Sequence, residues 1–187
     1  AEDGIRDYKV TGLQTCALPF SGSIKPNKPD RYSKNVGYNL FLEASYLDRG
    51  VLPVAPLRGT QMIRLRSKTV HGSSADDHQG VILSKSAVSQ IGHGDFISFK
   101  NINLDGITKV SARVASGGAG GEIHIKLGSP RGEIIGKAIV QANGSWKDYI
   151  EQEFKLEKCE GRHHLYVCFH NPGVGNGLMN FASLKFQ

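Results

Sequence analysis

The stretch SARVASGGAGGEIHIKLGSPRGEIIG, residues 111–136, decides the fold class. On both sides of its glycine cluster, at residues 110–114 and 123–127, apolar side chains alternate with polar ones. Successive side chains of a β-strand point to opposite faces of a sheet, so the alternation predicts two strands that each bury one face. The glycines favour a tight turn between them. A phosphate-binding loop is the weaker interpretation, because no helix start and no Lys-Ser/Thr pair follows.

Similar segments extend from this stretch toward both ends and predict an all-β protein. Short apolar runs bounded by Gly, Pro, Asn and Asp recur, without a strong helical periodicity. We expect strands within residues 81–88, 95–100, 107–116, 121–127, 133–140, 146–154, 163–169 and 178–186. About eight such strands, with a hydrophobic content of 39%, predict a β-sandwich of the jelly-roll type.

Three further motifs follow one another in a distinctive order: GDFISF at 94–99, GSWKDY at 144–149 and GLMNF at 177–181. Together with the opening stretch, they resemble the family 6 carbohydrate-binding modules over residues 67–187, about two thirds of the chain. The resemblance implies a β-sandwich that binds a polysaccharide or oligosaccharide and catalyses no reaction itself.

The candidate binding residues are Trp146, Asn180 and Gln90. A sugar presents apolar C–H faces between its hydroxyls, so its site needs an exposed aromatic plane and hydrogen-bonding groups. By the resemblance, Trp146 stacks on the sugar and Asn180 hydrogen-bonds to it, while Gln90 stands where the family has a second platform, a tyrosine. Tyr149 is a weaker substitute for that platform. A core tryptophan and a strand-edge asparagine remain the alternatives.

The family's structural calcium is not expected here. By the resemblance, its ligands are a glutamate near the first strand and an aspartate near the last, and these positions hold Ser73 and Ala182. Calcium requires several oxygen ligands, which these two residues do not supply. Asp76 and Asp77 are an alternative pair of ligands, although a turn is the simpler interpretation for them. We therefore predict no cofactor and no metal.

The first third of the chain lies outside the resemblance to the carbohydrate-binding modules. Residues 1–20 resemble the translation of a sequencing adapter, and we exclude them from fold reasoning. Residues 21–66 begin as a polar linker and continue with two strand-like segments, 38–50 and 59–67, which resemble the remnant of an upstream β-rich unit. We expect that the natural protein carries a catalytic domain upstream, outside this sequence.

Charge and cysteine content restrict the partners. The net charge is +6, but Lys and Arg are scattered without runs or interleaved aromatic residues, which argues against a nucleic-acid footprint and leaves an acidic glycan open. No apolar run reaches the length of a membrane span. Cys168 is expected to be a buried thiol, and a disulfide with Cys159 is the alternative. The seven histidines show no metal-ligand spacing.

Three functional hypotheses follow. The first is a monomeric, extracellular or periplasmic module that binds polysaccharide and targets an attached enzyme to it. The second is a degenerate module that has lost binding and acts as a structural spacer, which the residues at positions 73, 90 and 182 motivate. The third is a small glycosidase or lyase, which only the polar clusters suggest. With one aromatic platform, we expect a dissociation constant of about 0.1–1 mM or weaker.

Overall fold

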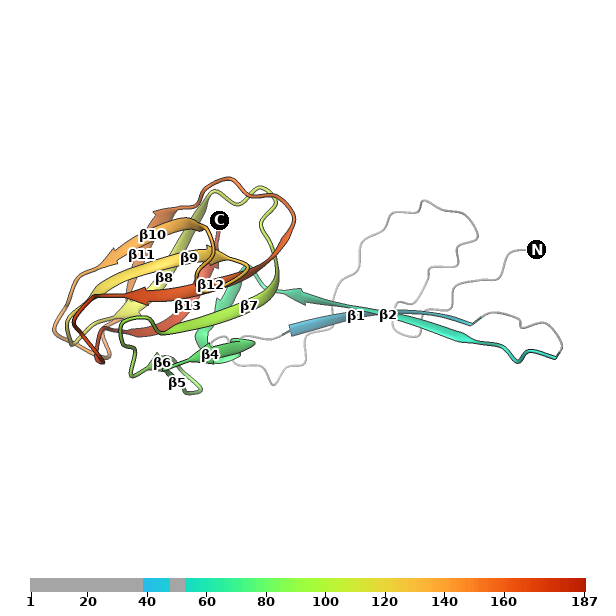
Figure 1. Cartoon of the computed structure of the whole chain (residues 1–187), viewed down its shortest axis with the longest axis horizontal. Coiled ribbons are helices and arrows are strands. Elements are labelled where there is room, and N and C mark those ends of the chain that lie inside the picture. The colour runs from blue at the N-terminus through green and yellow to red at the C-terminus, as the bar shows by residue number, and fades with distance from the viewer. Residues whose placement is uncertain (1–38, 48–52) are drawn as a thin grey trace. The chain divides into compact units, whose positions relative to one another are not determined.

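The computed structural model describes residues 39–47 and 53–187. Within these residues the chain divides into two compact units: a hairpin that ends at Leu65, and a β-sandwich from Arg66 to Gln187. Both are drawn in Figure 1. Residues 1–20 and the linker predicted over residues 21–35 lie outside the described residues.

The first unit is a two-stranded hairpin. Strand β1 (Asn39–Leu47) pairs with β2 (Arg58–Arg66), close to the two strand-like segments predicted from the sequence. Its large apolar side chains are mostly exposed, among them Phe41, Leu57 and Met62, at 55%, 65% and 55%. A two-stranded hairpin buries little surface and is at best marginally stable alone. The hairpin is therefore a poor candidate for an independent functional unit.

The second unit consists of two β-sheets packed face to face (Figure 1). The first sheet has the order β10 (Ile134–Val140), β9 (Gly121–Leu127), β12 (Arg162–His170), β7 (Phe96–Asn103) and β4 (Asp77–Gln79). The second has the order β11 (Ile150–Lys155), β8 (Lys109–Ala115), β13 (Asn180–Phe186), β6 (Val88–Ser89) and β5 (Ile82–Leu83), and β3 (Thr69–His71) also pairs with β13. The chain alternates between the sheets, as in a jelly roll, so the predicted all-β sandwich is confirmed.

The core follows the alternation that the sequence predicts. Val110, Ala112 and Val114 on β8 are fully buried, and so are Ile123 and Ile125 on β9. The residues between them on β8 face outward from the second sheet, because the side-chain period of a strand is two. The two inner faces therefore form one hydrophobic core, which holds the loops at the sheet ends in fixed positions.

The structure departs from the predicted strands at three places. Residues 81–88, expected as one strand, form β5 and β6 around a turn in which the Ser84 hydroxyl bonds to both backbone groups of Ala87. Asp77 belongs to strand β4 rather than to a turn. Residues 146–149, expected within a strand, form a loop, because the Ser145 hydroxyl accepts the backbone N–H groups of Lys147 and Asp148 and competes with sheet pairing.

Among the described residues, the only helix is the three-residue 3-10 turn Gly72–Ser74, so none of them forms a helix able to cross a membrane.

Candidate functional site

Trp146 lies in the loop between β10 and β11, and 42% of its surface is exposed. The indole packs on a pair of glycines in the loop between β8 and β9. A Cβ added to Gly117 would lie 2.7 Å from the indole Nε1, and one added to Gly118 would lie 2.8 Å from Cη2. Both rings of the indole therefore contact glycine backbone, and the remaining surface is open to a ligand. A core tryptophan, the alternative interpretation, does not describe this exposure.

Asn180, the first residue of β13, holds the tryptophan loop in place. Its Nδ2 donates a hydrogen bond of 3.0 Å to the Trp146 carbonyl oxygen. A second amide in the same loop acts similarly, since Asn143 Nδ2 donates to the Asp148 carbonyl at 2.7 Å and its Oδ1 accepts the Ser116 N–H at 3.1 Å. The loop is thus fixed to both of its neighbours. The Asn180 side chain also hydrogen-bonds with Tyr149, so only part of its amide remains for a ligand.

Tyr149 lies at the end of the same loop and is partly buried. Burial raises the pKa of its phenol, while the Arg113 charge and a hydrogen bond with Asn180 act in the opposite direction. The Arg113 guanidinium carbon lies 5.1 Å from the centre of the Tyr149 ring. Tyr149 therefore connects the asparagine to a cation on β8.

Gln90 follows β6 and is exposed. Its φ of 55° lies in the left-handed region, which is uncommon for a residue other than glycine. The next carbonyl, that of Ile91, accepts the Leu178 N–H at 2.9 Å, so this turn is joined to the segment that leads into Asn180. The Gln90 side chain makes no hydrogen bond to any described residue. The structure thus brings Trp146 and Asn180 into contact and places Gln90 on an adjoining segment without direct contact.

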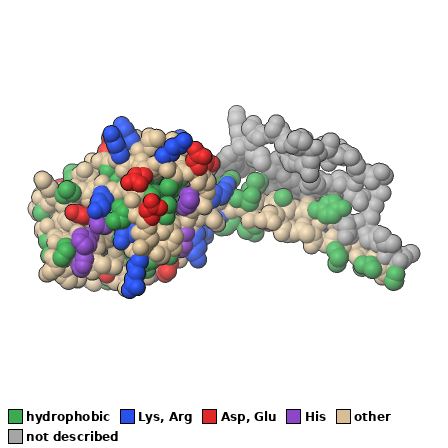
Figure 2. All heavy atoms as spheres, turned by 45° about the horizontal axis from the view of Figure 1, so that its top comes forward, with side chains coloured by type: hydrophobic (Ala, Val, Ile, Leu, Met, Phe, Trp, Pro, Cys, Tyr) green, Lys and Arg blue, Asp and Glu red, His purple; other side chains and the backbone are tan. Residues whose placement is uncertain are grey.

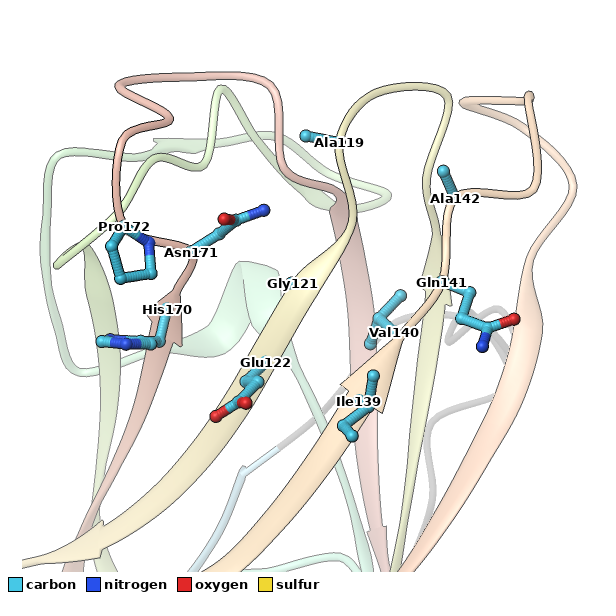
Figure 3. Close-up of a pocket in the computed structure, with 10 residues that line it drawn as sticks. All are labelled: Ala119, Gly121, Glu122, Ile139, Val140, Gln141, Ala142, His170, Asn171 and Pro172. Carbon is cyan, nitrogen blue, oxygen red and sulfur yellow. The ribbon is translucent and has the colours of Figure 1, made fainter.

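A second feature is an open hollow of about 490 Å³ at the end of the first sheet. Figure 3 shows Glu122 and Ile139 side by side on neighbouring strands, with His170 at the end of the next strand. Ile139 is 66% exposed, and the remaining lining is mostly small or polar. Neither tryptophan nor any other aromatic residue except His170 lines the hollow, so it offers no plane on which a sugar ring could stack.

Histidines from strands β9 and β12 and from the turn before β7 meet beside the hollow. The His170 ring stacks on His124 at 5.2 Å between centres and meets His93 edge-on at 4.6 Å. The Glu122 carboxylate lies 2.6 Å from His124 Nε2, and this hydrogen bond lowers the pKa of Glu122. Burial and then the charges of His93 and His124 lower the pKa of His170. Among the described residues, no group of three or more His, Cys, Asp or Glu side chains is arranged to hold a metal ion.

Charges of both signs are mixed on one face of the sandwich. On the face drawn in Figure 2, Lys and Arg side chains are interspersed with Asp and Glu, and no broad basic patch is seen. This distribution lacks the stripe of Lys and Arg typical of a nucleic-acid interface.

Comparison with known proteins identifies the sandwich. The family model described as carbohydrate binding module (family 6) matches residues 66–187. The chain belongs to carbohydrate-binding module family 6. The resemblance inferred from the sequence motifs is therefore confirmed, and the module is a binding unit rather than a catalytic domain.

Relatives of this family 6 module belong to larger proteins. The chain is 29% identical over 171 residues to an endo-1,4-beta-xylanase A of Thermoclostridium stercorarium. The matched segment covers 87% of this chain and 24% of that protein. It is 29% identical over 106 residues to an arabinoxylan arabinofuranohydrolase of Paenibacillus polymyxa, covering 56% of this chain and 16% of that protein. The chain thus spans about a quarter or less of these relatives.

A solved structure is similar over the module itself. A family 6 carbohydrate-binding module from Clostridium cellulolyticum in complex with xylose is 27% identical, with a TM-score of 0.60. The match covers 64% of this chain and 95% of the other.

The family's structural calcium does not fit the residues present. Ser73 lies in the 3-10 turn, and Ala182, which is 5% exposed, has no side-chain oxygen. The alternative ligand Asp76 is already engaged, since its Oδ2 pairs with the Arg66 guanidinium and accepts the Lys100 N–H at 2.7 Å. A guanidinium at that oxygen opposes a second cation. The lack of a calcium requirement remains a prediction.

Cys159 and Cys168 are free thiols in the module rather than a disulfide. Cys168 is buried as expected, and burial raises the pKa of both thiols. Neither cysteine is therefore activated as a nucleophile.

Sequence reasoning missed two features: the glycine pair on which the Trp146 indole is seated, and the Arg113 guanidinium over the Tyr149 ring. Gly117 and Gly118 were interpreted only as turn residues, although a Gly-Gly pair is also a signal for close approach of a large ring. Arg113 is an ordinary outward-facing strand residue by pattern, and only the fold places it next to Tyr149. The histidine group was missed for the same reason, because its members are far apart in the chain.

Proposed function

We propose that this family 6 module binds xylan or a related β-1,4-linked polysaccharide, with Trp146 as the stacking platform and Asn180 and Gln90 as hydrogen-bonding residues. The observation that carries the proposal is the half-exposed indole seated on glycine backbone and joined to Asn180 by a hydrogen bond. The similarity to a xylanase and to a module solved with xylose supports the choice of xylan.

The platform is ready for a ligand before it binds. Burial of one indole face of about 100 Å² contributes roughly 2–3 kcal/mol, and each net hydrogen bond adds about 1 kcal/mol. Association itself opposes binding by several kcal/mol. These terms give a dissociation constant of about 0.1–1 mM or weaker for a single platform.

Weak binding suffices for the role that we assign to the module. In a protein that also carries a catalytic domain, the module holds that domain at the polymer and raises its effective concentration without chemistry. A polysaccharide is too large to enter a cell, so this role places the protein outside the cell or in the periplasm. It requires one copy of the module, and we expect a monomer.

The decisive test is isothermal titration of the whole chain with xylan, arabinoxylan, cello-oligosaccharides and a β-1,3-glucan, in calcium and in EDTA. We expect binding to xylan with a dissociation constant of about 0.1–1 mM, unchanged in EDTA. No binding to any glycan at millimolar concentrations would overturn the proposal. It would favour the structural spacer instead, for which the glutamine in place of a second platform is the motivating observation.

The targeting role has a separate test. The whole chain fused to a xylanase catalytic domain should accelerate hydrolysis of insoluble xylan, and should leave hydrolysis of soluble xylo-oligosaccharides unchanged. Equal rates on insoluble xylan with and without the module would contradict targeting while leaving binding intact.

A further inference from the structure

Arg113 is a cation beside the proposed platform that has no acidic partner among the described residues. It lies on β8 and is exposed. The ion pairs in the described part of the sandwich are formed by other residues, since they join Arg66 to Asp76, His124 to Glu122, and Lys158 to Glu160. The guanidinium is held over the Tyr149 ring, 5.1 Å from its centre, and its N–H groups remain available to a ligand.

Glu151, the acidic residue directly opposite Arg113 on the neighbouring strand, hydrogen-bonds with another residue. Glu151 on β11 is the direct cross-strand partner of Arg113. Opposite charges at such positions commonly pair. Here the Glu151 carboxylate accepts a hydrogen bond from the Ser111 hydroxyl on the same face of β8, and no ion pair with Arg113 forms. The second cross-strand partner, Ser183 on β13, is uncharged.

Arg113 is continuous with the proposed sugar site. Trp146 is bonded to Asn180, Asn180 contacts Tyr149, and Tyr149 carries the guanidinium on its ring. An aromatic plane, an amide and a fixed cation thus follow one another from the loop onto the outer face of the second sheet. Beyond them, burial and the Arg113 charge lower the pKa of His71, so that this neighbour is uncharged at neutral pH.

The geometry points to a uronic acid substituent as part of the preferred ligand, with Arg113 as the residue that selects its carboxylate. This inference rests on the proposed function, because it names the substrate class of the same site. A guanidinium matches a carboxylate with two parallel hydrogen bonds, and stacking on Tyr149 fixes its orientation beforehand. The sandwich itself, residues 66–187, carries 14 Lys and Arg against 11 Asp and Glu, and this net charge of +3 further favours an acidic polymer over a neutral one.

The test compares two probes that differ only by the acid: xylotetraose, and xylotetraose carrying one glucuronic acid. The whole chain is titrated with each, and the ratio of the two affinities is the readout. We expect the acidic probe to bind about tenfold more tightly, as one charge-assisted contact provides. Arg113→Gln should bring the ratio to about one. Arg113→Lys should keep part of the preference for the acidic probe, because lysine retains the charge but cannot form two parallel hydrogen bonds to a carboxylate.

Lys109 supplies the matched control. It is an exposed cation at the start of the same strand, on the same face and about 13 Å away. Lys109→Gln removes the same unit charge and should leave the ratio near ten. Equal loss in both variants would show a general charge effect and overturn the assignment of Arg113.

The remaining outcomes separate this inference from the proposed function. Equal affinity of the unaltered chain for both probes would overturn the inference and leave the binding role standing. Binding of other glycans but of neither xylo-oligosaccharide would overturn the inference and the choice of xylan, and would leave only sugar binding in general. A ratio unchanged in Arg113→Gln would reduce Arg113 to a packing partner of Tyr149. No binding of any glycan would overturn both proposals.

Discussion

The Trp146 platform and the hollow over β9, β10 and β12 both depend on the loop of residues 116–121, yet they differ in chemistry. The platform has an exposed aromatic plane and a fixed amide. The hollow has a volume of about 490 Å³, but His170, the histidine that lines it, stacks on His124, and its carboxylate, Glu122, hydrogen-bonds with His124. We therefore expect the sugar at the platform rather than in the hollow, since stacking on an aromatic face supplies most of the contact energy.

The largest expected effect separates these two regions directly. Trp146→Ala removes the platform and should weaken xylan binding by about 50-fold, the equivalent of roughly 2–3 kcal/mol. Ile139→Ala removes an apolar side chain that is 66% exposed in the hollow and should leave the affinity unchanged. Titration of both variants checks the comparison. A reversed result would move the site to the hollow.

The seat of the indole gives the next effect. A Cβ at Gly117 would lie 2.7 Å from the indole, and the backbone there does not have a positive φ, so Gly117→Ala should displace the ring without straining the chain. We expect about tenfold weaker binding, since part of the stacking energy is lost, with little change in thermal unfolding.

Gly175→Ala is the control, because a Cβ at that position meets nothing within 4 Å. Normal affinity in Gly117→Ala would show that the indole does not need its seat.

Loss of the amide should have a smaller effect. Asn180→Ala removes the hydrogen bond to the Trp146 carbonyl and a hydrogen-bonding group proposed for the sugar, and we expect about fivefold weaker binding, or about 1 kcal/mol. Titration measures the affinity, and thermal unfolding reports whether the loop alone is affected. A change in stability with unaltered affinity would assign Asn180 a purely structural role.

Two glutamines provide a finer comparison. Gln90 lies beside the platform segment and Gln141 lines the hollow. Because an exposed hydrogen bond to a sugar competes with water, Gln90→Ala should weaken binding by about two- to threefold, and Gln141→Ala should have no effect. Titration of the two variants side by side gives the answer. Equal affinities would remove Gln90 from the site.

The smallest effect concerns the histidines of the hollow and appears in stability. The pKa of His170 in the folded state is lowered below 6.5, so the unfolded chain binds more protons when the pH falls below that value. Stability is therefore fully present above about pH 6.5 and declines on acidification. Thermal unfolding between about pH 7.5 and pH 5.5 should show a smaller decline for His170→Gln than for the unaltered chain.

His78→Gln, which changes an exposed histidine of β4, is the control and should retain the full decline. Parallel declines in all three proteins would place the titration elsewhere, for example at His164, whose pKa burial also lowers.

The sandwich and its core could be predicted from the sequence because alternation is a local signal. Residues 110–114 and 123–127 carry it plainly, and each buries the face that the pattern assigns. The motif order gave the family as well. The ends of the strands were harder to predict from the sequence. At residues 146–149 the Ser145 hydroxyl accepts backbone N–H groups and ends the strand pattern, which a periodic pattern does not reveal.

The composition of the site was only partly accessible from the sequence. The exposed tryptophan and the asparagine were named from motifs, and the structure places them in contact. Arg113 and the glycine seat became visible only in the fold, because their meaning depends on strands β8, β11 and β13 being neighbours. Contacts between residues that are far apart in the chain produce no periodic pattern in a single sequence.

Trp146 is the only tryptophan in the chain, and it is half-exposed at the proposed site. Fluorescence excited selectively in tryptophan therefore comes from a single residue and carries no contribution from the core. A ligand stacked on the indole would exclude water from it, shift its emission to shorter wavelength and protect it from a soluble quencher. The protein thus contains its own optical reporter, and weak binding constants can be measured without a label.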